Sequence, residues 1–137
     1  MECDKVIQEI LSWKGTRWRH LQTVKGGGVD CIQFPVAVAK NLGWLPQDFT
    51  TIKYARDWAT HNDYSILLQE LCKVTTNLQM TRDDIIEGHR LIPGDIIVMV
   101  MEKTAGHTGL YLSEGKFLHA HIRQGVICEP LLAYKDK

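Results

Sequence analysis

Hydrophobic positions in the first half of the chain recur at helical spacing. One amphipathic helix is predicted over residues 2–13, and its apolar face consists of Val6, Ile10, Leu11 and Trp13. A second is predicted over residues 31–42, and its buried face consists of Phe34, Val38 and Leu42. Gly15 ends the first helix and Gly43 the second, because glycine readily takes the left-handed conformation after a last turn. Residues 15–30 are rich in Gly, Thr, Arg and Lys, which indicates a loop.

Pro35 limits where the second helix can begin. Proline has no backbone N–H to donate and is tolerated only near a helix start. Cys31 is therefore expected at or just before the N-terminus of this helix. Further helices are predicted over residues 53–74 and over residues 81–88, where Thr81 can cap the N-terminus.

The second half of the chain changes to strand patterns after "RLIPGD". The segment "DIIVMVM" is apolar on both faces, which is typical of a buried strand. Two more strands, "HTGLYLS" and "KFLHAHI", are joined by the tight turn "SEGK", and "GVICEPLL" is predicted to be the last strand. Helices first and antiparallel strands second predict an α+β domain.

Composition and charge narrow the class of protein. A chain of 137 residues with 45% hydrophobic residues is typical of one domain with its own core, so residues 1–137 are interpreted as a single domain. Sixteen acidic residues balance sixteen basic ones, which argues against nucleic acid as a partner. The N-terminus is acidic where a signal peptide is basic, and no stretch approaches the roughly 20 apolar residues of a membrane span. We therefore expect cytoplasmic synthesis and no membrane partner.

The four cysteines are widely spaced and form no Cys-x-x-Cys pair, which argues against a disulfide framework or a zinc finger; they are Cys3, Cys31, Cys72 and Cys128. Three of them are interpreted as small hydrophobic residues. Cys31 differs, because "KGGGVD" precedes it and a helix follows. A helix N-terminus can lower a thiol pKa from about 8.5 toward 3.5–7.5, which favours a nucleophile. Glycines 26–28 would leave backbone amides free to hold an oxyanion.

Three histidines lie on the predicted hairpin, His107 in "AGHTGLYL" and His119 and His121 in "FLHAHI". Alternate strand positions share a face, so His119 and His121 project the same way, and His107 can lie beside one of them across the hairpin. A base next to an orienting partner is what a Cys–His site needs. The alternative is a zinc site made by Cys31, His107 and one further histidine, although the chain has no local ligand motif for it. No metal or cofactor is expected. The remaining histidines are interpreted as surface or satisfied polar residues, and they are His20, His61 and His89.

Four ordered motifs, "GTRWRHLQTVKGGGVDCIQF", "LIPGDIIVMV", "GHTGLYL" and "GKFLHAH", together resemble the NlpC-type cysteine peptidases. These are papain-like endopeptidases that cut stem peptides of the bacterial cell wall, and phages and gene transfer agents carry versions of them. The resemblance covers residues 15–46 and 91–131. It implies a papain-like fold with N-terminal helices packed on a C-terminal antiparallel β-sheet. It also implies that Cys31 is the nucleophile, His107 the base and His119 the residue that orients the imidazole.

The chain departs from the family pattern around the nucleophile. The family usually has Asp-Cys-Ser-Gly, whereas Ile32 and Gln33 here follow Asp30 and Cys31. The resemblance implies that Asp30 binds a substrate amine, and a helix N-cap is its other interpretation. Trp18 stands where the family has a tyrosine, and its indole can donate a hydrogen bond but offers no hydroxyl. We expect Trp18 to line the substrate site.

The sequence and the resemblance together predict a cysteine hydrolase that cleaves amide bonds in peptidoglycan stem peptides through a Cys-His-His triad. We expect it to act at the bacterial cell wall as part of a phage tail, a gene transfer agent or a similar assembly. Two alternatives stay open. One is an amidase or acyltransferase with a non-wall substrate, and the other is a catalytically silent structural module of a phage tail. The intact set of Cys31, His107 and His119 argues against the silent module.

Overall fold

A computed structural model describes residues 2–50, 91–101 and 104–134. Two helices and a two-stranded ribbon come first along the chain, and they are α1 (Glu2–Leu11), β1 (Thr23–Val24), β2 (Gly28–Val29) and α2 (Gln33–Asn41). A sheet and a short 3-10 helix follow, and they are β3 (Ile96–Met101), β4 (Thr104–Ser113), β5 (Lys116–His121), β6 (Gly125–Pro130) and η1 (Leu131–Tyr134). The helices expected over residues 53–74 and 81–88 lie outside the described residues.

The four long strands form one antiparallel sheet in the order β3-β4-β5-β6. Strands β4 and β5 pair at Leu110↔Leu118 and are joined by a tight turn, as the sequence predicts. Glu114 and Gly115 in this turn both have positive φ, 52° and 74°, which suits the right-handed twist of a hairpin. The described sheet therefore contains each predicted strand in its predicted order.

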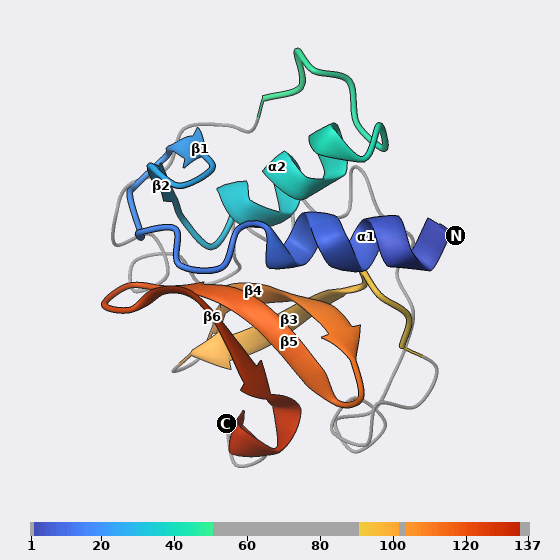
Figure 1. The fold of residues 1–137 in the computed structure, drawn as a ribbon. Coiled ribbons are helices and arrows are strands. Elements are labelled where there is room, and N and C mark those ends of the chain that lie inside the picture. Colours follow the sequence, from blue (N-terminus) through green and yellow to red (C-terminus); the bar gives the residue numbers. More distant parts are fainter. Residues whose placement is uncertain (1, 51–90, 102–103, 135–137) are drawn as a thin grey trace.

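Helices α1 and α2 lie on the same side of the sheet (Figure 1). Their apolar faces share one buried core with the sheet residues Leu110, Leu112, Leu118, Ala120 and Val126. The opposite face of the sheet carries a second, smaller cluster, which consists of Ile97, Tyr111, Phe117 and Leu131. The architecture is thus the α+β, papain-like arrangement that the resemblance implies. None of the described helices is long and apolar enough to cross a membrane.

Both helices are shorter than the hydrophobic pattern predicts. Helix α1 ends at Leu11 rather than at residue 13, and the buried Trp13 packs from the turns that follow. Helix α2 begins at Gln33 rather than at Cys31, because the Asp30 carboxylate holds the backbone just before the first turn. Pro35 is the third residue of α2, a position that needs no backbone N–H from it.

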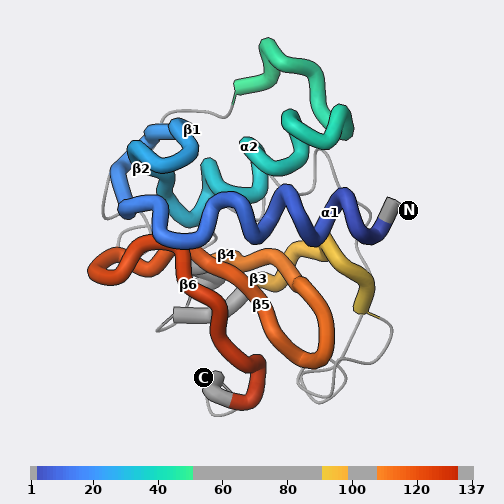
Figure 2. Tube along the Cα trace, viewed as in Figure 1, coloured from blue at the N-terminus to red at the C-terminus, as the bar shows by residue number. Residues whose placement is uncertain are grey.

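The segment after α1 closes the free edge of β6. Gly15 donates its backbone N–H to the carbonyl of Val126, and Val126 donates to the carbonyl of Thr16. Figure 2 shows this segment passing beside the turn between β5 and β6. A side chain on Gly125 would meet the Thr16 carbonyl oxygen at 2.3 Å, so this close approach requires glycine. These bonds hold the loop that leads to Cys31 against the sheet.

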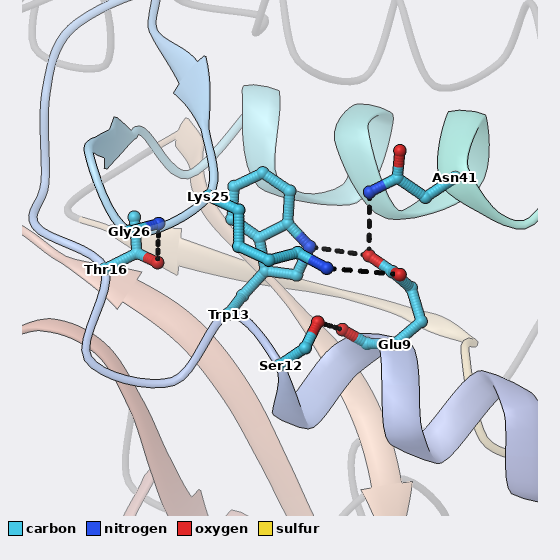
Figure 3. A network of polar contacts seen from close by, with 7 residues as sticks. All are labelled: Glu9, Ser12, Trp13, Thr16, Lys25, Gly26 and Asn41. Carbon is cyan, nitrogen blue, oxygen red and sulfur yellow. Dashed lines mark hydrogen bonds and ion pairs between the residues drawn. The ribbon is translucent and has the colours of Figure 1, made fainter.

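Glu9 links α1 to α2 and to the glycine-rich loop (Figure 3). Its Oε2 accepts hydrogen bonds from Trp13 Nε1 at 2.7 Å and from Asn41 Nδ2 at 2.9 Å. Its Oε1 lies 3.4 Å from Lys25 Nζ, and this ammonium also lies 5.5 Å from the centroid of the Trp13 ring. One carboxylate therefore connects both helices and the loop between β1 and β2.

Candidate active site

Cys31 lies where the loop after β2 meets the sheet. Its side chain is buried, and α2 begins two residues later. The side-chain hydroxyl of Thr108 in β4 donates a hydrogen bond to the Cys31 carbonyl oxygen. Thr108 is fully buried and directly follows His107 along the strand. The fold thus brings the backbone of Cys31 next to that of His107, although the two are far apart in sequence.

The immediate surroundings of the Cys31 sulfur favour the neutral thiol. Burial raises the pKa of Cys31 to about 12, and the adjacent Asp30 carboxylate adds to this shift. The backbone amides of Thr108 and of Cys31 itself act in the opposite direction but do not outweigh burial. The expected lowering of the Cys31 pKa by the helix N-terminus is therefore wrong for these surroundings. Ionisation of this sulfur needs a base that takes its proton.

Asp30 holds the loop that carries Cys31. Its Oδ1 accepts the backbone N–H groups of Ile32 at 3.0 Å and Gln33 at 2.8 Å, and its Oδ2 accepts that of Leu21 at 2.8 Å. The carboxylate is only 2% exposed. These contacts match the capping interpretation of Asp30, because the carboxylate satisfies the first N–H groups of the helical turn.

Trp18 and His20 lie beside this loop. Trp18 forms a parallel bridge to Val29, and its ring stacks on that of His20 with centroids 6.5 Å apart. Nδ1 of His20 lies 3.9 Å from Asp30 Oδ2. His20 is thus half-buried next to Asp30. No local pattern in the sequence separates it from the other two histidines outside the predicted hairpin, and all three share the interpretation as surface or satisfied polar residues. Trp18 is half-buried and packs against the main core.

His107 and His119 lie on neighbouring strands. The backbone of His107 belongs to β4, where it pairs with Met99 of β3. His119 in β5 is 1% exposed, and its Nε2 lies 2.6 Å from Oε1 of Glu129 in β6. Burial lowers the pKa of His119, and the Glu129 carboxylate opposes this shift.

His119 projects from the face of the sheet that is opposite to the helices. Leu118 and Ala120 alternate with His119 along β5 and pack with the helices, while Phe117 belongs to the opposite cluster. The His119 ring stacks on Phe117 with centroids 4.8 Å apart. The imidazole of His119 is thus held between the Phe117 ring and the Glu129 carboxylate.

His121 has a local structural role. Its Nδ1 accepts the backbone N–H groups of Arg123 at 3.1 Å and Gln124 at 3.2 Å, which stabilises the turn between β5 and β6. Its ring meets that of His119 edge-on, with centroids 6.1 Å apart. Among the residues that the structure describes, no group of three His, Cys, Asp or Glu side chains could hold a metal ion.

Glu129 and Thr108 contact predicted site residues and were not singled out from the sequence. The register of the β5–β6 hairpin places Glu129 opposite Phe117, two residues along β6 from Ile127, which lies opposite His119. Counting across the predicted hairpin could have found this proximity. No local sequence pattern could have predicted the contact of Thr108, because its partner Cys31 lies on a loop that is distant in sequence.

A buried cysteine directly ahead of a helix, packed on an antiparallel sheet that carries two histidine-bearing strands, defines the papain-like class of cysteine hydrolase folds. The chain belongs to the NlpC/P60 family, whose family model matches residues 11–135. Members of this family are in general cysteine peptidases and hydrolases, so membership indicates cell-wall peptidase activity. A search of curated proteins finds no match to this chain.

Proposed function

We propose that this protein is a cysteine hydrolase that cleaves amide bonds in peptidoglycan stem peptides, with Cys31 as nucleophile, His107 as base and His119 as the orienting residue. The hydrogen bond between Thr108 and the Cys31 carbonyl carries the proposal, because it joins the nucleophile's backbone to the strand of the base. Membership of the NlpC/P60 family supports the substrate class.

The raised pKa of Cys31 supports a first step in which a base removes the thiol proton during attack. The Sγ proton passes to a His107 ring nitrogen as the sulfur attacks the scissile carbonyl carbon, which gives a tetrahedral oxyanion. The imidazolium then protonates the leaving amine, the C–N bond breaks, and a thioester remains on Cys31. Water, deprotonated by the same imidazole, hydrolyses the thioester and releases the acid and the free thiol.

The oxyanion site uses the backbone next to the nucleophile. The Cys31 N–H is close to its own sulfur and is positioned to donate to a developing oxyanion. In this proposal Trp18 lines the substrate cleft beside the loop, and Asp30 keeps that loop rigid through its three backbone hydrogen bonds. A substrate amine bound by Asp30 would have to share a carboxylate that these contacts already engage.

We further propose that residues 1–137 form one catalytic domain, made in the cytoplasm and carried to the cell wall by a phage tail, a gene transfer agent or a similar assembly. This placement rests on the family resemblance alone, because phages and gene transfer agents carry versions of these peptidases. It predicts that the protein copurifies with particles when its host genome region is induced.

Digestion of purified peptidoglycan tests the proposed activity. Wild-type protein should release stem-peptide fragments that mass spectrometry assigns to one cleaved amide bond, and Cys31→Ala should release none. His107→Ala should lower kcat by roughly 10²–10⁴-fold, as expected for loss of a general base. His121→Ala is the matched control and should keep most of the activity. Intact peptidoglycan after incubation with folded wild-type protein would refute the proposal, and turnover of a non-wall amide alone would reassign the substrate.

A further inference from the structure

The proposed Cys-His-His triad does not include Glu129, although this residue contacts His119 directly. The two side chains meet at 2.6 Å between Nε2 and Oε1, a distance typical of a charge-assisted hydrogen bond. The His119 side chain is buried at 1% exposure, whereas the Glu129 side chain is 28% exposed. A buried imidazole is thus tied to a carboxylate that still reaches solvent.

This contact determines where the imidazole proton lies. An ionised carboxylate can only accept hydrogen bonds, so Nε2 of His119 must be the donor. Burial lowers the pKa of His119, so the ring is neutral near neutral pH and carries a single N–H. With that proton on Nε2, the other nitrogen, Nδ1, is unprotonated and can only accept a hydrogen bond.

The ring is also fixed in orientation by its neighbours. Phe117 stacks on it at 4.8 Å with an interplanar angle of 17°. A Cβ on Gly109 would come within 2.6 Å of the Phe117 ring, so the glycine in "HTGLYL" leaves the space that this ring needs. His119 therefore has one ring plane and one tautomer.

We infer that Glu129 is a positioning residue of the active site, which holds His119 as the Nε2-protonated tautomer so that Nδ1 can accept a hydrogen bond from the N–H of the base. This inference rests on the proposed function. A third residue orients a catalytic imidazole by accepting its N–H, and a neutral histidine does this only when the accepting nitrogen is unprotonated. Glu129 supplies that condition from the neighbouring strand, and it adds a fourth residue to the proposed catalytic group.

Two measurements on the same variants test this role. Long-range ¹H–¹⁵N correlation spectra of ¹⁵N-labelled protein report which nitrogen of His119 is protonated, with His119→Asn used to assign the signals. Kinetics on peptidoglycan fragments then separate kcat from KM. The variants are Glu129→Gln, which keeps one acceptor oxygen, and Glu129→Leu, which keeps none. Glu114→Gln, in the exposed β4–β5 turn, is the matched control.

Wild type should show the Nε2-protonated tautomer, and Glu129→Leu should lose this preference. The kcat of Glu129→Leu should fall by about tenfold or more, as for outer hydrogen-bond partners of metal-bound imidazoles, with KM little changed. The kcat of Glu129→Gln should fall less than that of Glu129→Leu, and the kcat of Glu114→Gln should match that of wild type. An unchanged tautomer, or a lower melting temperature with unchanged kcat, would overturn the inference. If wild type fails to cut peptidoglycan, the proposed function fails, and the tautomer comparison alone still decides whether Glu129 sets the proton position.

Discussion

For the single residue Cys31, the surroundings favour the neutral thiol over the thiolate. Its sulfur is buried beside a carboxylate, and both effects stabilise the thiol. Backbone amides of Thr108 and Cys31 favour the thiolate only in part. The reactivity of this residue therefore depends on proton transfer to a base rather than on a preformed thiolate.

Alkylation of Cys31 should consequently depend on His107. In wild type, iodoacetamide should modify Cys31 near neutral pH, whereas His107→Ala should slow this reaction by about 10²-fold or more, because the remaining surroundings keep the sulfur protonated. Mass spectrometry of peptide fragments measures the rate at each cysteine. The exposed Cys3 is an internal control whose rate should not change, and His121→Ala is the control variant. Equal rates at Cys31 in wild type and His107→Ala would exclude His107 as the base.

Asp30 offers a second test at the residue scale. If Asp30 caps the helical turn, its replacement should lower stability, whereas if it binds a substrate amine, its replacement should raise KM for substrates with a free amine. Asparagine replaces one acceptor oxygen by an amide that cannot accept, so Asp30→Asn should destabilise the protein by about 1–3 kcal/mol. Thermal unfolding measures this loss. Per folded molecule, KM should change equally for substrates with a free amine and for their N-acylated forms. A rise in KM confined to free-amine substrates would instead assign Asp30 to amine binding.

At the scale of elements, the loop that leads to Cys31 depends on how α1 and α2 are connected. Glu9 accepts hydrogen bonds from Trp13 and Asn41 and pairs with Lys25, so it touches α1, α2 and the loop ahead of β2. The helices themselves are only ten and nine residues long, too short to be stable alone. The two helices therefore depend for their stability on packing against the core and on the contacts of the Glu9 carboxylate.

Glu9→Ala should therefore lower stability by about 1–3 kcal/mol, because donors in a half-buried place lose their acceptor. Chemical denaturation measures the free energy of unfolding. Asp4→Ala, at an exposed position of the same helix, is the control and should stay within about 0.5 kcal/mol of wild type. Wild-type stability in Glu9→Ala would show that apolar packing alone holds the two helices.

For the whole molecule, the buried His119 couples stability to pH. Its pKa in the folded protein is lowered by burial, while in the unfolded chain it returns to about 6.5. Below that pH the unfolded chain binds a proton that the folded protein excludes. The stabilising contribution is therefore complete above about pH 6.5 and is lost as pH falls toward the lowered folded value.

Urea unfolding of wild type should accordingly give a lower free energy of unfolding at about pH 5.5 than at about pH 7.5. His119→Asn removes the titrating group, so its free energy of unfolding should decrease less between about pH 7.5 and about pH 5.5 than that of wild type. His119→Gln is a second variant in case the first folds poorly. If both variants lose as much stability on acidification as wild type does, His119 makes no contribution to this pH dependence.

The sequence by itself determined the two described helices and the four long strands, because their signals are local, whereas the short β1–β2 ribbon lies in the segment predicted to be a loop. Helical spacing in residues 2–13 and 31–42 and strand patterns after residue 95 depend only on neighbours along the chain, and the described helices and strands follow them. The helix ends differ from the predicted ends by at most two residues. Cys31 and His119 could also be selected, because a residue ahead of a helix or on a strand is visible as a pattern.

Only the tertiary structure decided what surrounds those residues. The approach of Thr108 to Cys31, the pairing of His119 with Glu129 and the place of His20 beside Asp30 each join segments whose distance depends on packing. The direction of the Cys31 pKa shift has the same origin. A helix N-terminus is a local feature and favours the thiolate, whereas burial under the sheet is a property of the assembled core, and in these surroundings desolvation is the larger effect.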